Sequence, residues 1–159
     1  MAIIRKEAYF NSSTGKNKIH CMIWQDDAVK PIALFQIAHG MSEHIERYDD
    51  FACFLAGHGF IVCGNDHLGH GKSVNSLDDL GYMDDKTAIS AWLMICISCI
   101  TSCTTRYPDL PYFLFGHSMV PSFPAPTPHT SARSCRCNLL WYGRASRLPG
   151  GCVSAFDKV

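Results

Sequence analysis

The serine at position 118 stands in the tetrapeptide Gly-His-Ser-Met (116–119), directly after the apolar run 112–115. A nucleophile elbow places a serine on a sharp turn after a strand, and the turn is so tight that it needs small residues two positions before and after the serine. Gly116 meets this requirement, whereas Val120 stands where glycine is expected. The pattern predicts that the Ser118 hydroxyl attacks an acyl carbonyl. Gly-x-Ser-x also occurs in ordinary strand-end turns, so the tetrapeptide alone is a weak signal. Its position after a buried strand is the observation that supports a nucleophile elbow.

A second candidate segment, His39-Gly40-Met41, follows the apolar run 32–38. A loop at the end of such a strand can present a backbone N–H to the oxygen of the reacting carbonyl. Together with the N–H of the residue after Ser118, it would form an oxyanion hole. A plain glycine turn, with polar residues that cap the next helix, is the alternative interpretation.

Side chains of metal-ligating types occur in the segment 65–73, which contains Asp66, His67 and His70. No fourth ligand follows at a suitable spacing, and the two glycines of this segment favour a compact loop. The cysteines at 96, 99 and 103, and those at 135 and 137, have no partner Cys-x2-Cys motif with which they could share a metal ion. We therefore expect no metal ion.

The segments that must position these residues alternate between strand and helix patterns. Strand patterns flank a polar turn and predict a hairpin with one buried face, at 7–11 and 18–25. Nearly continuous apolar runs predict strands that are covered on both faces, at 32–38, 60–63 and 112–115. Helices are predicted at about 48–56 and at 87–105.

This order of elements is typical of an α/β fold with a mostly parallel sheet, an N-terminal hairpin and flanking helices. The pattern ends at residue 119. Five of the eight prolines fall in 120–159, and no strand or helix period appears there. We expect 1–119 to be part of one α/β domain and 120–159 to be an irregular tail rich in Pro, Arg and Cys.

Charge changes at the same boundary. Residues 1–119 hold 9 of the 14 Lys and Arg and 13 of the 14 Asp and Glu, so the tail is basic. The whole chain has a formal net charge of zero, which gives no general attraction to nucleic acid. A composition that changes abruptly within a motif is what a shift of reading frame would produce, a hypothesis that the nucleotide sequence around codons 119 and 120 would test.

Two features bear on location. The first residues, Met-Ala-Ile-Ile-Arg-Lys-Glu, carry charges where a secretory signal would be apolar, so we expect reduced cysteines and a cytoplasmic protein. The run 87–105 contains no charged residue. A membrane span needs about 20 predominantly apolar residues, and this run includes several serines and threonines. A buried helix is the expected structure, and a small membrane-associated protein is the alternative.

Taken in order, four motifs resemble those of the monoacylglycerol lipase and lysophospholipase family, which is grouped with serine aminopeptidase-like α/β-hydrolases. The similarity covers about residues 5–119, and its motifs are His-Gly-Met-Ser-Glu-His (39–44), Asp-His-Leu-Gly-His-Gly-Lys-Ser (66–73), Tyr-Pro-Asp-Leu-Pro (107–111) and Gly-His-Ser-Met (116–119). The resemblance implies that Ser118 is the nucleophile and that the backbone N–H groups of Met41 and Met119 form the oxyanion hole. It implies a structural role for His117, a small lipid or ester substrate and no cofactor.

The family pattern stops at Met119, whereas the family places the acid and the histidine of the triad far downstream, in the order Ser, Asp, His. Residues 120–159 contain only His129 and Asp157, in the reverse order, and we assign neither to a triad. The resemblance therefore predicts a truncated and nearly inactive hydrolase. It also predicts an unpaired apolar edge along 112–115 that favours self-association. A non-catalytic fragment that binds another protein through this edge is the alternative function.

Overall fold

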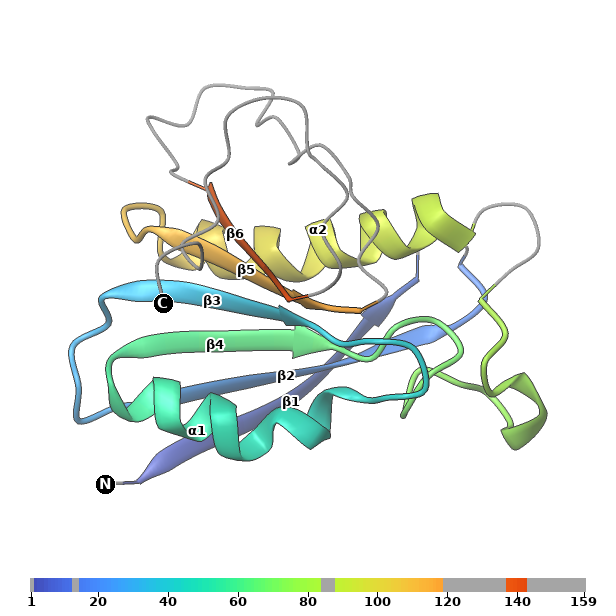
Figure 1. Cartoon of the computed structure of the whole chain (residues 1–159), viewed down its shortest axis with the longest axis horizontal. Coiled ribbons are helices and arrows are strands. Elements are labelled where there is room, and N and C mark those ends of the chain that lie inside the picture. The colour runs from blue at the N-terminus through green and yellow to red at the C-terminus, as the bar shows by residue number, and fades with distance from the viewer. Residues whose placement is uncertain (1, 13–14, 84–87, 119–136, 143–159) are drawn as a thin grey trace.

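The computed structural model of the chain describes residues 2–12, 15–83, 88–118 and 137–142. They form a six-stranded sheet with flanking helices (Figure 1). The strands are β1 (Ile3–Asn11), β2 (Lys18–Asp26), β3 (Ala33–Ala38), β4 (Phe60–Asn65), β5 (Tyr112–His117) and β6 (Cys137–Tyr142). The helices are the α-helices α1 (Asp49–Gly57) and α2 (Ala88–Arg106) and the short 3-10 helices η1 (Ile45–Tyr48) and η2 (Leu77–Asp79).

The sheet has the strand order β1-β2-β4-β3-β5-β6. β1 and β2 form an antiparallel hairpin, and β2 pairs antiparallel with β4. β4, β3, β5 and β6 are parallel to one another. Because β3 and β5 are parallel neighbours, their carboxyl ends lie at the same edge, with Ala38 opposite Gly116. The mostly parallel sheet with an N-terminal hairpin that the sequence predicts is confirmed.

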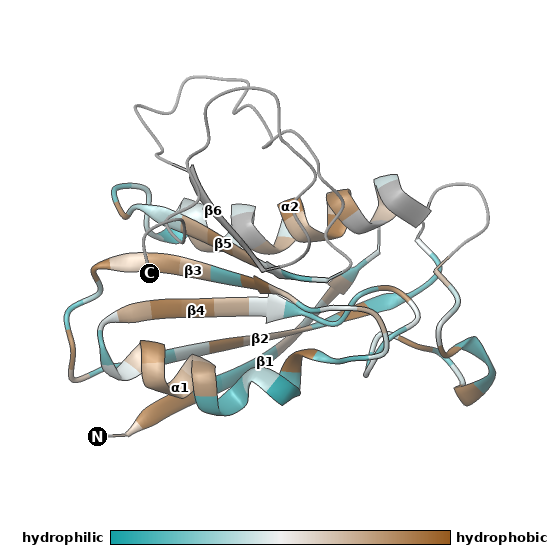
Figure 2. Ribbon diagram, in the orientation of Figure 1, coloured by the Kyte–Doolittle hydropathy of each residue, from teal (hydrophilic) through white to brown (hydrophobic). Residues whose placement is uncertain are grey.

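The two α-helices cover opposite faces of the sheet (Figure 1). Phe35, Ile37 and Val62 pack in one cluster with Ala52 and Ala56 of α1. The residues that alternate with them along the strands belong to a second cluster, which includes Cys99 and Cys103 of α2; they are Leu34, Ile61 and Cys63. Strand side chains point alternately to the two faces, so continuous apolar runs such as those of β3 and β4 supply both cores (Figure 2).

β2 departs from the predicted hairpin with one buried face. Ile19 and Cys21 are buried as expected, but His20, Met22 and Trp24 on the other face are buried as well. The reason is the position of the strand. β2 lies between β1 and β4 rather than at an edge, and α1 packs on the face that carries Met22 and Trp24.

β6 is a further correction to the predicted tail. We expected no regular element after residue 119 and an unpaired edge along β5. Instead, β6 pairs with the whole of β5, from Tyr112 opposite Cys137 to His117 opposite Tyr142. The sequence Leu-Leu-Trp-Tyr within β6 is apolar and aromatic, a composition that favours strands, and the open hydrogen-bonding groups of β5 supply its partner. The remaining tail residues, 119–136 and 143–159, lie outside the described residues.

The helix predicted at 87–105 is confirmed as α2. It packs small and apolar residues against the sheet; those whose burial is described include Ala91, Ile95, Cys96, Cys99 and Cys103. Within the described part of the chain, no helix combines the length and the apolar character needed to cross a membrane.

Candidate active site

Ser118 lies one residue beyond the carboxyl end of β5, in a left-handed backbone conformation with φ 57°. Its side chain is exposed. For a residue with a Cβ, this conformation costs roughly 1–2 kcal/mol. Such strain persists only where the surrounding structure maintains it, and strained residues are concentrated at functional sites. The chain thus turns sharply at Ser118 and exposes its hydroxyl at the edge of the parallel strands.

Gly40 brings the loop after β3 against this turn. A Cβ added at Gly40 would stand 2.9 Å from Nδ1 of His117, 3.2 Å from the His117 carbonyl oxygen and 3.4 Å from Cβ of Ser118. Only glycine fits at this distance without displacing the neighbouring atoms. Met41, the next residue, is 61% exposed. The structure therefore brings the predicted residues Ser118 and Met41 to the same edge, on adjacent strand ends.

Glu43 links the two segments. Its Oε2 atom accepts hydrogen bonds from the Gly40 N–H at 3.1 Å and from the Tyr48 hydroxyl at 2.7 Å, and it lies 3.3 Å from Nδ1 of His117. Partial burial raises the pKa of Glu43, but the hydrogen bonds from Tyr48, Gly40 and His117 outweigh it, so the net pKa is lowered. Glu43 is therefore an ionised acceptor that fixes the loop against the residue before Ser118.

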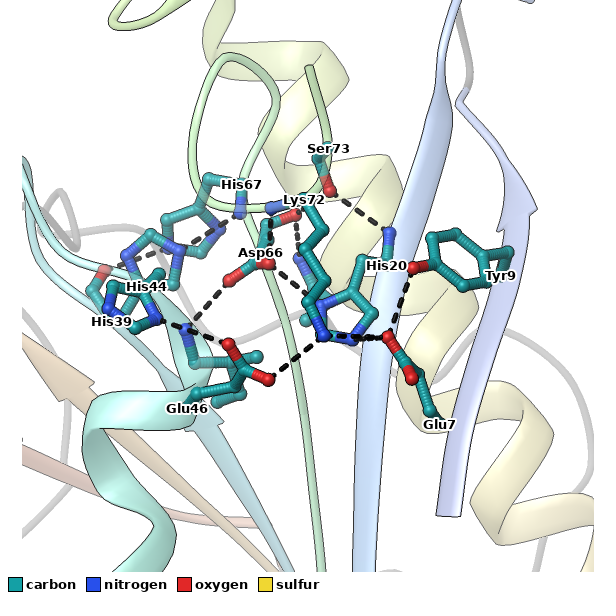
Figure 3. Close-up of polar contacts among 12 residues, drawn as sticks. Glu7, Tyr9, His20, His39, His44, Glu46, Asp66, His67, Lys72 and Ser73 are labelled. Carbon is teal, nitrogen blue, oxygen red and sulfur yellow. Dashed lines mark hydrogen bonds and ion pairs between the residues drawn. The ribbon is translucent and has the colours of Figure 1, made fainter. Parts of the chain in front are cut away.

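Two buried histidines hold the same loop from inside. Nδ1 of His39 lies 2.7 Å from the carbonyl oxygen of Gly40, and Nε2 of His39 accepts the backbone N–H of His67 at 3.0 Å. Nε2 of His67 lies 2.8 Å from the carbonyl oxygen of His39 (Figure 3). The two rings are 3.8 Å apart between centroids. Burial lowers the pKa of both imidazoles, that of His39 to about 4.

The loop after β4 is organised by the buried carboxylate of Asp66. Its Oδ1 accepts the Ile45 N–H at 2.7 Å, and its Oδ2 accepts the Lys72 N–H at 2.8 Å and lies 2.7 Å from Nδ1 of His20 (Figure 3). Gly71 has φ 50°, and a Cβ there would overlap the Asp66 carboxylate. The polar side chains of this loop thus stabilise the conformation of the loop. Among the described residues, no group of three or more His, Cys, Asp or Glu side chains is arranged to hold a metal ion.

Several predicted residues lie outside the described part of the chain. They are Met119, assigned to the oxyanion hole, and His129 and Asp157, left without a role. Conversely, sequence reasoning missed the parts played by Glu43 and His39. Both belong to the motif His-Gly-Met-Ser-Glu-His, so the available signal was a carboxylate three residues after a strand-end glycine.

Comparison with known sequences places residues 29–119 in the family described as serine aminopeptidase, S33. The chain is 35% identical over 105 residues to a monoglyceride lipase homolog of monkeypox virus, covering 64% of this chain and 34% of that protein. It is 33% identical over 101 residues to the monoglyceride lipase of Mus musculus, covering 64% and 31%. The chain thus spans about a third of the length of these relatives.

Solved structures show the same fold. A thermostable carboxyl esterase from Bacillus coagulans is 33% identical, with a TM-score of 0.67 over 74% of this chain and 37% of that one. A lipase in an open form has a TM-score of 0.70 at 24% identity, over 87% of this chain and 44% of that one. The first of these combines likeness of sequence with likeness of fold, and the second supports the fold alone.

Proposed function

Because the chain belongs to the serine aminopeptidase (S33) family of α/β-hydrolases, we propose that its site is built for the hydrolysis of carboxylic esters, with Ser118 as the nucleophile. One observation carries the proposal. Ser118 has a left-handed backbone directly after β5, and the glycine of the neighbouring loop stands against it. A strained serine at the carboxyl edge of parallel strands is the geometry that a nucleophile elbow requires.

In the proposed reaction, Oγ of Ser118 forms a bond to the acyl carbon. The ester C–O bond then breaks, and the alcohol leaves with the proton of the serine. Water afterwards hydrolyses the acyl-enzyme, releases the carboxylic acid and restores the hydroxyl. The charge that develops on the carbonyl oxygen needs donors that are already in place. We assign this role to the N–H groups of Met41 and Met119. The Gly40 N–H is donated to Glu43, which makes Met41 the next amide of the loop.

The described activities of the relatives support a proposal for the substrate class. Proteins with similar sequences are described as monoglyceride lipases and one with a similar structure as a carboxyl esterase. We propose a small lipid ester, a monoacylglycerol or a lysophospholipid, and no cofactor. Six cysteines of the sheet and helices are free thiols, which supports the cytoplasm as the compartment; they are Cys21, Cys53, Cys63, Cys96, Cys99 and Cys103.

We further propose that this chain alone turns over esters very slowly. In the family, the nucleophile needs a histidine base that an acid orients, and we assign neither role within this sequence. Serine triads without their base lose on the order of 10⁴–10⁶ in kcat, and the oxyanion hole supplies what remains. The chain thus carries the nucleophile and the oxyanion donors of the reaction.

The test uses the full chain and two readouts. A fluorophosphonate probe, which forms an Oγ–P bond and expels fluoride, is expected to label Ser118 slowly, because no base is assigned to activate its hydroxyl; the label is read by peptide mass spectrometry after long incubation. The Ser118→Ala variant is expected to lose this label, and the matched variant Ser102→Ala, on the exposed face of α2, is expected to keep it. Labelling that survives in Ser118→Ala would refute the assignment. Rapid hydrolysis of p-nitrophenyl butyrate that disappears in Ser118→Ala would refute the slow turnover.

A non-catalytic role is the second candidate function, and one observation favours it. β6 is the last strand of the sheet within the described residues, and only β5 pairs with it there. A strand with open hydrogen-bonding groups can pair with another chain, so we propose self-association through this edge as the alternative. A stable, soluble oligomer by light scattering, with no label on Ser118, would favour it over the hydrolase.

A further inference from the structure

We propose that His39, held by His67, is a positioning residue that aims the N–H of Met41 into the oxyanion hole. The proposal rests on the proposed function, because it assigns a task to a residue of that same site. It concerns a buried side chain whose ring nitrogens contact the backbone of Gly40 and His67, so it would act on the site through the backbone.

The first step is the peptide bond between Gly40 and Met41. The carbonyl oxygen of Gly40 and the N–H of Met41 belong to one planar peptide unit, and the described residues contain no cis peptide. In a trans peptide the C=O and N–H bonds point in opposite directions. Since Nδ1 of His39 lies 2.7 Å from the Gly40 carbonyl oxygen, this contact sets the direction of the Met41 N–H, away from the histidine pair.

The second step is the tautomer of His39. The backbone N–H of His67 can only donate, so Nε2 of His39, at 3.0 Å, must accept and carries no proton. A neutral imidazole then holds its proton on Nδ1. That is the nitrogen that faces the Gly40 carbonyl, so it donates there. The backbone of the loop after β4 thereby sets the hydrogen bond that orients the loop after β3.

The third step is the reciprocal contact. The carbonyl oxygen of His39 can only accept, so Nε2 of His67, at 2.8 Å, carries the proton of that ring. Each histidine thus contacts the main chain of the other, and the ring centroids lie 3.8 Å apart with the ring planes tilted by 32°. The pair joins the ends of β3 and β4 and leaves the Gly40 peptide little freedom to rotate.

Charge reinforces the arrangement. Burial lowers the pKa of His39 to about 4, so the ring is neutral at physiological pH. A protonated His39 would have no lone pair for the His67 N–H. The titratable groups around the ring act in both directions, since the charges of Asp66 and Glu43 raise its pKa and that of His70 lowers it. Burial outweighs them.

Two variants of His39 separate positioning from simple packing. His39→Asn places an amide NH₂ where Nδ1–H stands, so the donor to the Gly40 carbonyl remains. His39→Gln places its amide near Nε2, so the acceptor for His67 remains and the donor to Gly40 is lost. We expect fluorophosphonate labelling of Ser118 to be slowed about 100-fold in His39→Gln, the effect of one misplaced oxyanion donor. In His39→Asn it should stay within a few-fold of the unsubstituted chain.

Equal losses in both variants would mean that the imidazole only fills space, and normal labelling in both would mean that it has no role. Either result overturns the proposal. Circular dichroism and thermal unfolding of each variant show that the compared proteins are folded.

A second measurement does not depend on the chemistry of Ser118. In the full chain labelled with ¹⁵N-histidine, long-range ¹H–¹⁵N correlation spectra report which ring nitrogen carries the proton. We expect Nδ1–H for His39 and Nε2–H for His67, both unchanged from pH 8 to pH 6. The opposite tautomer of His39, or a doubly protonated ring at pH 6, would overturn the proposal.

The two failures are distinguishable. If the probe does not label Ser118 in the unsubstituted chain, the proposed function fails, and the tautomers together with the Met41 amide resonance decide the positioning. That resonance should move in His39→Gln and return toward its original place in His39→Asn. A resonance that is the same in both variants would overturn the positioning by itself.

Discussion

Nδ1 of His117 lies 3.3 Å from Oε2 of Glu43, although 74 residues separate the two in sequence. His117 is the last residue of β5 and precedes Ser118, and Glu43 lies in the loop after β3. The same carboxylate oxygen accepts the Gly40 N–H. One atom therefore connects the two segments that the proposed reaction needs together, and its hydrogen bonds favour the ionised carboxylate.

Replacement of Glu43 tests this link. Glu43→Ala removes the shared acceptor, and we expect the free energy of unfolding to fall by about 1–3 kcal/mol, the cost of unsatisfied donors in a partly buried site. Labelling of Ser118 should slow as well. Glu43→Gln keeps an oxygen acceptor without charge and should lose less by both measures, which are urea unfolding and probe kinetics.

Glu46→Ala is the matched control, because its exposed carboxylate pairs at the surface with Lys72. An exposed pair contributes about 0–1 kcal/mol, and labelling should not change. If Glu46→Ala loses as much stability and as much Ser118 labelling as Glu43→Ala, the link through Glu43 is contradicted.

Gly40→Ala should separate the two loops. The added Cβ would stand 2.9 Å from Nδ1 of His117, closer than such atoms approach, so one segment has to move. We expect a loss of Ser118 labelling that exceeds the loss of stability. Gly57→Ala, in α1 with no atom within 4 Å of its Cβ, should stabilise the protein by about 0.5–1 kcal/mol. Normal labelling in Gly40→Ala would contradict the close approach of the loops.

The turn at Ser118 can be tested through its strain. Glycine adopts φ 57° without the penalty that a Cβ brings, whereas alanine retains it. We expect the Ser118→Gly variant to have a free energy of unfolding about 1 kcal/mol higher than that of Ser118→Ala. Both variants lack the hydroxyl, so the comparison isolates the backbone. If Ser118→Gly is the less stable of the two, the left-handed turn is absent in solution.

Gly71→Ala probes the loop that Asp66 organises. The new methyl group would overlap the Asp66 carboxylate, and the residue has φ 50°. We expect a loss of 3 kcal/mol or more, roughly the effect of disrupting a buried polar network, as a lower midpoint in thermal unfolding. Gly15→Ala shares the left-handed φ, at 71°, but has open space around its Cβ. Gly15→Ala should lower the free energy of unfolding by only about 1–2 kcal/mol. Equal losses in the two variants would argue against an overlap of the new methyl group with the Asp66 carboxylate.

Stability should fall as the solution becomes acidic, because of His39. Its pKa is about 4 in the folded chain, against an ordinary value of 6.5, so the unfolded chain binds the proton first. The contribution of His39 to the free energy of unfolding is fully present above pH 7. It falls by about 3 kcal/mol as the pH drops from 6.5 to 4. Urea unfolding at a series of pH values measures this slope.

Substitution provides the control for this pH effect. His39→Asn should make the slope shallower by the contribution of His39 and leave that of His67, whose pKa burial also lowers. The exposed His58→Asn should leave the slope unchanged. A slope in His39→Asn as steep as that of the unsubstituted chain would assign the pH dependence to other groups.

The sequence by itself determined the elements up to residue 118 and the position of the serine. Apolar runs at 32–38, 60–63 and 112–115 are local patterns, and the buried strands occur where those patterns predict them. The turn at Ser118 was predictable for the same reason, since Gly116 two residues earlier satisfies a short-range steric requirement.

Only the tertiary structure decided which distant groups meet. The acceptor role of Glu43, the pairing of His39 with His67 and the addition of β6 to the sheet each join segments that are far apart in the chain. A local pattern records which face of an element is apolar, but it does not record the partner against which that face packs. The direction of a hydrogen bond depends on that partner, so these contacts followed from the fold rather than from any single motif.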